Sequence, residues 1–595
     1  MRDARVGQDQ GRLRRTSAVA ALLVTHAVLL AYSATQNSPV RDEVGQLPAG
    51  ISHWTYGRYE LYRVNPPLMR MVAALPSLAV GYKEDWHSFD SDLHARPEFA
   101  VGRDFVRANG SDWFRLYLLG RWACIPFCLL GAVVCYRWAL ELWGPPAGFV
   151  SLALWCFCPN ILGHGQLIMT DAAAAAMGAS AAYTFWRWLE RPTWPRAALA
   201  GCALALAELT KTTWIVLVLI WPLIWVFSVL ARRGRRSTND EAAQRRPWIE
   251  AGQMATVFAI ALFALNLVYG FRGTLRPLGR YHFVSGTLSG VAAPAPIPAG
   301  PATGVQPAPS GEGNRFRSTL LGALPVPLPA AYVQGIDLQR RDFERLHPAF
   351  LAGHWKMGGW WYYYLWALLV KLPIATLCLV VTAAAAALCT KAYRADWCSE
   401  CCLVLPPLAV LLLASSQTAL HSHFRYVLPV LPFVYVSVSR VGRALTLGHR
   451  ALGIFVIVSV VAAIAGGLRN YPHTLSFANV LFGGPSGGAR QLAGSNIDWG
   501  QDMFALRRWS EAHPHARPLY VACDHILDPA AFAIAADELP PAAATRPPAG
   551  WYAISTNELH AESGRYRWFF GQKPIDRAGG SIYLYRVPGG PITVK

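Results

Sequence analysis

Charged side chains stand beside apolar segments at several places in this sequence, and these residues could do chemistry. They occur where an apolar run begins or ends, at Asp42, Glu43, Asp171, Lys211 and Arg425. A charged group next to hydrocarbon is costly, so such groups usually face a cavity or a partner. Carboxylates close to lysine and arginine suit a substrate that carries a phosphate. The cations can hold the phosphate while a carboxylate removes a proton from an incoming hydroxyl or amine.

The composition places these residues in a membrane protein. Of 595 residues, 53% are hydrophobic and only 15% are charged, whereas a soluble domain carries about 25% charged residues. Disordered and collagen-like chains are excluded because they are never this apolar. The chain has 54 Lys and Arg against 35 Asp and Glu. In a soluble protein this surplus would favour nucleic acid, but here we expect it in cytoplasmic loops and expect no nucleic-acid partner.

Long apolar runs predict a polytopic α-helical membrane protein with about eleven transmembrane helices, since a helix needs about 20 apolar residues to cross the hydrocarbon core. The runs lie at residues 17–34, 116–140, 146–163, 170–189, 197–209, 212–230, 251–270, 360–389, 402–418, 424–439 and 451–468. Glu208 and Lys211 interrupt the stretch 197–230, and each of its halves is short.

Arginine predicts how these helices are oriented. Residues 1–16 hold five arginines and read as a basic cytoplasmic N-terminus. Counted from there, the connections 191–196, 231–247 and 439–450 fall on the cytoplasmic side, and each is rich in arginine. We therefore expect a multi-pass protein of the cytoplasmic (inner) membrane.

The same count defines the external parts of the chain. A transmembrane domain over residues 17–469 carries two large external loops, 35–115 and 271–359. Within the second loop, residues 291–313 are rich in Pro, Ala and Gly and read as a linker. Residues 470–595 are also external. With both large loops and this region outside, we expect the active site to face the extracytoplasmic side.

Polar residues near the spans fall on this external side in the predicted topology. They include the five named above together with Arg121, Thr170, Glu208, His421, His423 and Tyr426. Structural polar residues would divide between the two faces, so the one-sided distribution favours a cavity that opens outward. The alternative is that these side chains only pair with one another and tie helices together.

Residues 470–595 are predicted to form a small extracytoplasmic α/β domain. Runs rich in β-formers at 518–522, 551–555 and 581–587 alternate with polar segments, of which 499–509 is the first expected helix. Eleven of the twelve cysteines lie in or beside the predicted spans, so disulfides are not expected to hold this domain.

Several segments resemble the lipid-carrier-dependent glycosyltransferases of the GT-C type, a group that includes the protein O-mannosyltransferases and the aminoarabinose transferases of lipid A. The resemblance covers most of residues 38–502. It rests on Asp42-Glu43 with His53, Gly57 and Asn65-Pro66-Pro67-Leu68, on Thr170-Asp171, Leu209-Thr210-Lys211, Trp360 to Tyr363 with Lys371-Leu372-Pro373, and His423 to Pro429, and on Phe477 to Asp502.

The resemblance implies a GT-C-like fold and the transfer of a sugar, a hexose or a pentose, from a polyprenyl-phosphate carrier to an extracytoplasmic acceptor with inversion. The acceptor would be a glycan, a lipid or a protein. Asp42 would be the catalytic base and Glu43 would help to place a substrate. Lys211 and Arg425, with Arg121, would bind the donor phosphate. We expect the remaining substrate contacts at His53, Asn65, Asp171, His423, Tyr426 and Asp498.

Metal binding is the weaker reading of several other residues. Asp90 and Asp92 could hold a divalent cation, as could converging external histidines. Their spacing demands neither site, so we expect no cofactor and no metal ligand set. A transporter or flippase of lipid-linked saccharides is the alternative function, because it too would need a charged cavity. Transporters are commonly built from repeated halves with midplane sites, and the sequence shows no repeat.

Overall fold

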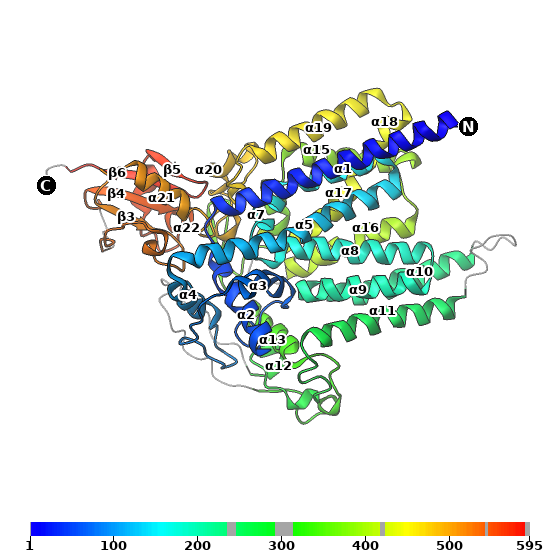
Figure 1. Cartoon of the computed structure of the whole chain (residues 1–595), viewed down its shortest axis with the longest axis horizontal. Helices are drawn as coiled ribbons and strands as arrows, with labels where there is room; N and C mark the ends of the chain where they lie inside the picture. The colour runs from blue at the N-terminus through cyan, green and yellow to red at the C-terminus, as the bar shows by residue number, and fades with distance from the viewer. Residues whose placement is uncertain (1, 235–245, 292–312, 417–422, 542–545, 590–595) are drawn as a thin grey trace.

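The computed structural model describes residues 2–234, 246–291, 313–416, 423–541 and 546–589. Most of the predicted linker 291–313, most of the loop 231–247 and His421 lie outside the described residues. The molecule is a bundle of long helices that carries its large loops and its C-terminal domain at one end (Figure 1). The N-terminus and α18 lie at the opposite end.

The bundle has a helix at each of the eleven predicted runs. Its elements are α1 (Arg2–Gln36), α5 (Trp113–Trp143), α6 (Pro145–Cys156), α7 (Pro159–Gly165), α8 (Thr170–Glu190), α9 (Trp194–Thr210), α10 (Ile215–Gly234), α11 (Pro247–Val268), α14 (Tyr363–Lys371), α15 (Ile374–Cys389), α16 (Trp397–Ser416), the 3₁₀ helix η9 (Phe424–Val430), α17 (Leu431–Val438), α18 (Ala444–Leu447) and α19 (Arg450–Leu468).

Fewer of these helices than expected are long and apolar enough to cross a membrane on their own. Among the described residues, seven helical segments are long and apolar enough to cross a membrane, or up to nine if each bent pair is one span. The bent pairs are α6 with α7 at 54° and α14 with α15 at 115°. The count of about eleven is higher because it includes α9, which has only 17 residues, and α8, which is not among the segments apolar enough to cross a membrane.

Small residues let the helices around α8 approach closely. Alanine fills positions 172–176 of α8, and all five are buried. A Cβ on Gly178 would lie 1.7 Å from the indole of Trp214, so only glycine fits. Trp214 follows α9 in a short 3₁₀ turn and donates its indole N–H to the carbonyl of Ala174 at 2.8 Å. This contact holds the end of α9 against the beginning of α8.

The two large loops, predicted to be external, contain helices and a hairpin that the sequence patterns did not reveal. The first loop holds η1 (Arg41–Gly45), α2 (Gln46–Tyr56), α3 (Leu68–Val80) and α4 (Glu98–Asn109), and the second holds α12 (Gly286–Ser289), α13 (Ala330–Glu344) and the antiparallel pair β1 (Pro348–Leu351) and β2 (His354–Met357). Tyr332 of α13 packs in one apolar cluster with Leu209 of α9 and Leu265 of α11. It also donates its hydroxyl to Glu208 at 2.7 Å, which fixes α13 over the end of α9.

The C-terminal domain has the predicted α/β character. Its sheet has the order β3-β4-β6-β5, with β3 (Leu519–Ala522) parallel to β4 (Gly550–Ser555) and the other neighbours antiparallel. The three predicted strands are confirmed as β3, β4 and β6 (Ile582–Val587), while β5 (Asp576–Ala578) was not expected. The domain also contains α20 (Gly484–Gly488), α21 (Met503–Ala512) and α22 (Thr556–Leu559). All twelve cysteines are free.

Helix α21 begins four residues later than predicted because the preceding segment binds the loop that follows α1. The hydroxyl of Ser38 donates to the carbonyl of Gly500 at 2.8 Å, and its amide donates to the carbonyl of Gln501 at 2.8 Å. The amide of Arg41 donates to the carbonyl of Trp499 at 3.1 Å. Segment 499–501 is therefore anchored beside η1, the turn that carries Asp42.

A buried carboxylate completes this junction. Asp502 accepts from the amides of Gly580 and Ser581 at 2.8 Å each and lies 2.9 Å from Nδ1 of His473. Burial disfavours the charge on His473, but the neighbouring Asp502 outweighs burial and raises the pKa of His473. Burial likewise opposes the charge on Asp502, and its pKa is nevertheless lowered by His473 and its hydrogen bonds.

The raised pKa of His473 predicts a loss of stability at alkaline pH. A histidine whose pKa rises on folding stabilises the protein fully below its unfolded pKa, and this contribution disappears as pH rises through the folded value. Asp502 does not change the stability of the fold in this alkaline range, because a lowered carboxyl pKa affects stability only at acid pH. Between about pH 6 and about pH 9 the apparent Tm of the wild type should fall more than that of His473→Gln. Thermal unfolding in detergent measures both slopes, and equal slopes would contradict the assignment.

Candidate active site

Four charged side chains form a continuous chain of ion pairs at the end of the bundle that carries the loops. Asp42 accepts from Nη2 of Arg425 at 2.9 Å, and Nη1 of Arg425 lies 3.8 Å from Asp171. Asp171 in turn accepts from Nζ of Lys211 at 2.7 Å. The members at the two ends, Asp42 and Lys211, belong to segments far apart in the sequence. The structure therefore brings together the predicted base and two of the three predicted phosphate ligands, Lys211 and Arg425.

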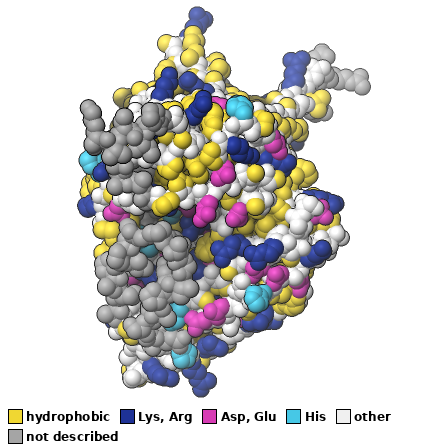
Figure 2. Space-filling view, turned by 90° about the vertical axis from the view of Figure 1, so that its left-hand side faces the viewer, with side chains coloured by type: hydrophobic (Ala, Val, Ile, Leu, Met, Phe, Trp, Pro, Cys, Tyr) yellow, Lys and Arg dark blue, Asp and Glu magenta, His cyan; other side chains and the backbone are white. Residues whose placement is uncertain are grey.

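Each member of the chain stands where a helix begins or ends. Asp42 lies in η1, which begins a few residues after the end of α1, and Asp171 lies in the first turn of α8. Lys211 occupies the extended residue between α9 and the turn that contains Trp214, and Arg425 lies in η9. These are positions where backbone geometry changes, so the side chains can turn toward one place. Figure 2 looks onto this end of the molecule, over which side chains of both charges are spread.

A second ion pair, fully buried, lies next to Asp42. Both carboxylate oxygens of Glu43 accept from Arg121, at 2.8 Å from Nε and 2.7 Å from Nη2, and neither side chain is exposed. Arg121 uses its remaining nitrogen on the carbonyls of Ala34 and Asn37 at 2.8 and 2.7 Å. Glu43 also accepts from the amide of Ile168 at 2.8 Å.

This pair changes the reading of two predicted residues. Each nitrogen of the Arg121 guanidinium donates at least one hydrogen bond inside the protein, and the side chain is 0% exposed, so it is enclosed by protein and does not face the cavity beside Lys211. Glu43 is equally enclosed, with both carboxylate oxygens on Arg121. Their contacts instead join the end of α1, helix α5 and the start of the α7–α8 turn. In this structure Arg121 and Glu43 hold the turn that presents Asp42.

Aromatic rings surround the two cations of the site. The guanidinium of Arg425 lies 4.2 Å from the ring centroid of Trp499 and 5.5 Å from that of Tyr426. The ammonium of Lys211 lies 5.2 Å from the Tyr426 ring. A cation over an aromatic face is attracted to it and held in place. Trp499 was not among the predicted site residues, although it lies in a motif that carried the resemblance.

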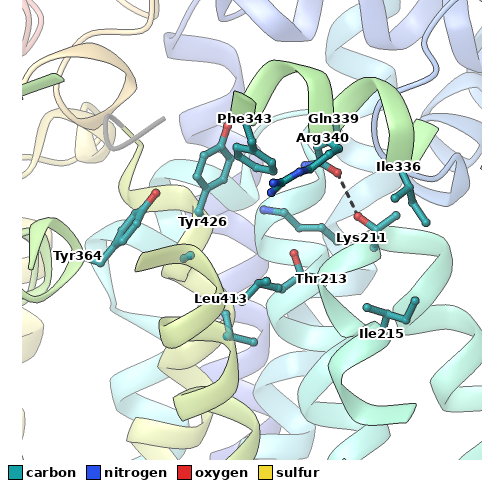
Figure 3. A pocket seen from close by; sticks show the side chains of 13 residues that line it. Lys211, Thr213, Ile215, Ile336, Gln339, Arg340, Phe343, Tyr364, Leu413 and Tyr426 are labelled. Atoms are coloured by element: carbon teal, nitrogen blue, oxygen red, sulfur yellow. Dashed lines mark hydrogen bonds between the residues drawn. The ribbon is translucent and has the colours of Figure 1, made fainter. Parts of the chain in front are cut away.

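A cavity of about 230 Å³ opens beside Lys211 and Tyr426 (Figure 3). Its upper wall is α13, which contributes Arg340 and Phe343, and its lower wall is apolar and comes from α10 and α16. Thr212 donates to Gln339 of α13 at 3.1 Å across one edge. No role was predicted for α13, which lies inside the loop 271–359.

Two polar atoms of the ion-pair chain are left without hydrogen bonds. Nε of Arg425 and Oδ2 of Asp171 are buried and have no hydrogen-bond partner among the described residues. Buried polar atoms are usually satisfied, and an unmade hydrogen bond costs about 1–3 kcal/mol. The ion-pair chain can therefore form hydrogen bonds with a further polar group.

His53 and Asn65 lie around Arg70, apart from the ion-pair chain. Nε of Arg70 donates to Nε2 of His53 at 3.0 Å, and the carbonyl of Arg58 lies 2.6 Å from Nδ1. Burial, followed by the charge of Arg70, lowers the pKa of His53 to about 3, so the ring is neutral. Asn65 has a left-handed backbone with φ of 63°, and its carbonyl accepts from Arg70. Both residues shape the first loop.

His423 and Asp498 connect the site to the C-terminal segment. Nδ1 of His423 lies 2.7 Å from the hydroxyl of Ser495, and its ring is edge-on to Tyr426 at 5.4 Å. Asp498 is buried and accepts from the amides of Gly500 at 3.2 Å and Asn557 at 3.3 Å. Burial raises the pKa of Asp498 to about 7. Asp498 thus fastens segment 494–502 to the sheet domain.

No group of three or more metal-ligating side chains occurs in the part of the chain that the structure describes. The carboxylate of Asp90 accepts from the amide of Asp92 at 2.9 Å, which is the geometry of an ordinary loop turn.

Comparisons with known proteins give no sequence match and a distant structural one. No protein-family model and no curated protein sequence matches the chain. Among solved structures, ArnT from Cupriavidus metallidurans matches in its apo state with 12% identity over 96% of this chain and 98% of that chain, at a TM-score of 0.44. The same protein bound to undecaprenyl phosphate matches with 11% identity and the same coverage and TM-score.

A second solved protein is similar over less of its length. The oligosaccharyltransferase from Archaeoglobus fulgidus in its apo form has 12% identity over 84% of this chain and 58% of its own chain, at a TM-score of 0.38. Both proteins are GT-C glycosyltransferases, the type that the motifs resemble. At these levels of similarity the activity has to be argued from the site itself.

The pair Glu43–Arg121 should matter more for stability than the pair Asp42–Arg425. Glu43→Gln leaves the buried charge of Arg121 without its partner, which should cost about 3–5 kcal/mol. Asp42 is 20% exposed, so Asp42→Asn should cost clearly less. Unfolding of the purified variants in detergent compares the two losses. Equal losses would show that Glu43 does not hold the turn.

Proposed function

We propose that this protein transfers a sugar from a polyprenyl-phosphate carrier to an extracytoplasmic acceptor, with Asp42 as the base. The observation that carries the proposal is the chain Asp42–Arg425–Asp171–Lys211, which ends beside a cavity with an apolar wall. One site thereby offers a carboxylate for a hydroxyl or amine, cations for a phosphate, and apolar surface for a lipid.

The donor phosphate is assigned to Lys211 and Arg425. Both cations lie against the ring of Tyr426, and Lys211 lines the cavity (Figure 3). The buried Nε of Arg425 lacks a hydrogen-bond partner among the described residues, and a phosphate oxygen would supply it. Tyr426 lines the same cavity as Lys211 and fits the substrate contact expected from the sequence.

The polyprenyl chain is assigned to the lower part of the cavity. Ile215 of α10 and Val410, Leu413 and Ala414 of α16 form this wall. Ile215 and Leu413 are exposed in the protein alone, as expected for residues that face lipid in a membrane. An isoprenoid chain can therefore leave the cavity between α10 and α16 while its phosphate stays with the cations.

The proposed reaction is a single displacement at the anomeric carbon. The acceptor oxygen or nitrogen forms the new bond as the bond from the anomeric carbon to the carrier phosphate breaks, which inverts the configuration. Asp42 takes the proton of the acceptor, and Lys211 and Arg425 stabilise the charge that develops on the phosphate. Asp171 holds the two cations together. No covalent enzyme intermediate is required.

The distribution of arginines supports an extracytoplasmic site in the inner membrane. Arg12, Arg14 and Arg15 lie near the start of α1, and Arg440 and Arg443 lie in the turns before α18. Both regions are at the end of the bundle opposite the C-terminal domain (Figure 1). Cytoplasmic loops are enriched in Lys and Arg, so the end that carries the ion-pair chain is assigned to the outside.

Transport of lipid-linked saccharides is the competing function, and the site does not favour it. A transporter needs its charged groups near the middle of the membrane, between two repeated halves. Here the charges stand at helix ends beneath the loops. Consumption of a polyprenyl-phosphate sugar by the purified protein in detergent separates the two functions, because a flippase would leave the donor intact.

Replacing the proposed base should abolish transfer and leave the fold intact. Asp42→Asn keeps the size of the side chain but cannot accept the proton, so the rate should fall by about 10²–10⁴-fold. Asp90→Asn is the matched control, since Asp90 is an exposed carboxylate in the same loop. Transfer is measured with undecaprenyl-phosphate sugars and the acceptors of a membrane extract. A rate of Asp42→Asn close to that of Asp90→Asn would refute the role of Asp42.

The site as described needs no metal ion, because cations of the protein take the phosphate. Treatment with EDTA should therefore leave the transfer rate unchanged, and added Mg²⁺ or Mn²⁺ should not raise it. A rate that EDTA abolishes and a divalent cation restores would contradict this prediction and would direct attention to Asp90 and Asp92.

A further inference from the structure

A second and larger cavity lies on another side of the bundle, between α15, α19 and the segment 477–486. Its volume is about 1170 Å³, above the range of about 300–1,000 Å³ that holds drug-sized ligands. None of the residues of the ion-pair chain lines it. It is therefore separate from the site assigned to the donor.

The walls of this cavity belong to the membrane region. Phe455 and Val458 of α19 line it and are 39% and 59% exposed. Cys378 of α15 lines it as well and is also exposed. Helix α19 is one of the candidate spans, and α15 lies beside it in Figure 1. In a bilayer this surface borders lipid chains.

The end of the cavity nearest the C-terminal domain is positively charged. Arg469 follows the last residue of α19, and Arg577 comes from β5 of the sheet domain. Both are exposed, and neither guanidinium has an ion-pair partner among the described residues. Arg577 rests on the ring of Tyr583 at 4.7 Å, which holds its charge at the rim. No carboxylate lines the cavity.

From this arrangement we infer that the cavity binds an anionic phospholipid. Its acyl chains lie along α15 and α19, and its phosphate pairs with Arg469 and Arg577. Basic side chains close to a membrane surface attract acidic lipid headgroups, and arginine holds a phosphate with two parallel hydrogen bonds. A zwitterionic lipid gains less, because its own cation meets two arginines. The lipid would join the last membrane helix to the sheet domain.

The location of the bound lipid gives it an influence on the proposed site. The segment 477–486 that roofs the cavity continues into residues 494–502, which contact both η1 and η9. Asn479 anchors this roof to the turn between α14 and α15, donating to the carbonyl of Leu372 at 3.0 Å. Asn496 accepts from the amide of Phe424, the residue before Arg425, at 2.7 Å. The binding itself does not depend on the proposed transfer reaction.

Photo-crosslinking of the full-length protein tests the inference. The protein is placed in phosphatidylcholine nanodiscs that contain a small fraction of phosphatidylglycerol with a diazirine in its acyl chain. Labelled peptides should map to residues 374–378 of α15 and 455–466 of α19. Unlabelled phosphatidylglycerol should compete, and added phosphatidylcholine should not. The double variant R469Q/R577Q loses two charged hydrogen-bond donors. The concentration of unlabelled phosphatidylglycerol that halves the labelling should therefore be about tenfold higher, or more, than for the wild type.

Matched controls keep the outcome clear. R508Q removes an exposed arginine of α21 that does not line the cavity and should label as the wild type does. If R469Q/R577Q unfolds, the comparison of the two competitors on the wild type decides alone. Equal competition by phosphatidylcholine, wild-type labelling of a folded R469Q/R577Q, or displacement at lower concentration by undecaprenyl phosphate would each overturn the inference. So would crosslinks that join two copies of the chain in place of lipid.

Discussion

The position of Asp42 depends on the buried ion pair between Glu43 and Arg121. A buried pair adds little stability by itself, because the cost of removing two charges from water offsets their attraction. The pair instead fixes the orientation of the two side chains, because a guanidinium and a carboxylate meet in a fixed planar geometry. Arg121 adds two carbonyls at the end of α1, and Glu43 adds the amide of Ile168. The turn that follows α1 therefore has one arrangement, and Asp42 points from it toward Arg425.

The C-terminal segment completes the site from the other side. Trp499 covers the guanidinium of Arg425 and binds the backbone of Arg41 through its carbonyl. Asp498 and Asp502, on either side of it, accept from amides of the sheet domain. The sheet domain thus has a physical role in the membrane region, because it fixes the segment that lies against η1 and η9. Loss of these contacts would remove the ring of Trp499 from Arg425 and the backbone hydrogen bond from Arg41.

The sequence predicted the helices of the bundle and three of the four strands of the terminal sheet, because apolar runs and alternating β-formers are local signals. It also placed Asp42, Asp171, Lys211 and Arg425 on one side, since the charge of the loops sets the topology. It could not distinguish Glu43 and Arg121 from these residues, because only three-dimensional packing shows which charges are enclosed. Helix α13 and Trp499 were missed for a related reason. Their contribution comes from contacts with distant parts of the chain, and Trp499 is uncharged, while the charges of α13 stand in the middle of a long loop, away from any apolar run.

The ion-pair chain contains two acids and two bases, so its charges balance before a substrate binds. In the proposed reaction the carrier enters as a phosphate diester with one negative charge and leaves as a monoester, whose second ionisation has a pKa of about 6. The same lysine and arginine that favour departure of the phosphate therefore bind the spent carrier more tightly than the loaded one. Turnover then requires a step that weakens the binding of the spent carrier. Proton transfer from Asp42 to the monoester would remove the extra charge and would return the carboxylate to Arg425 in the same event.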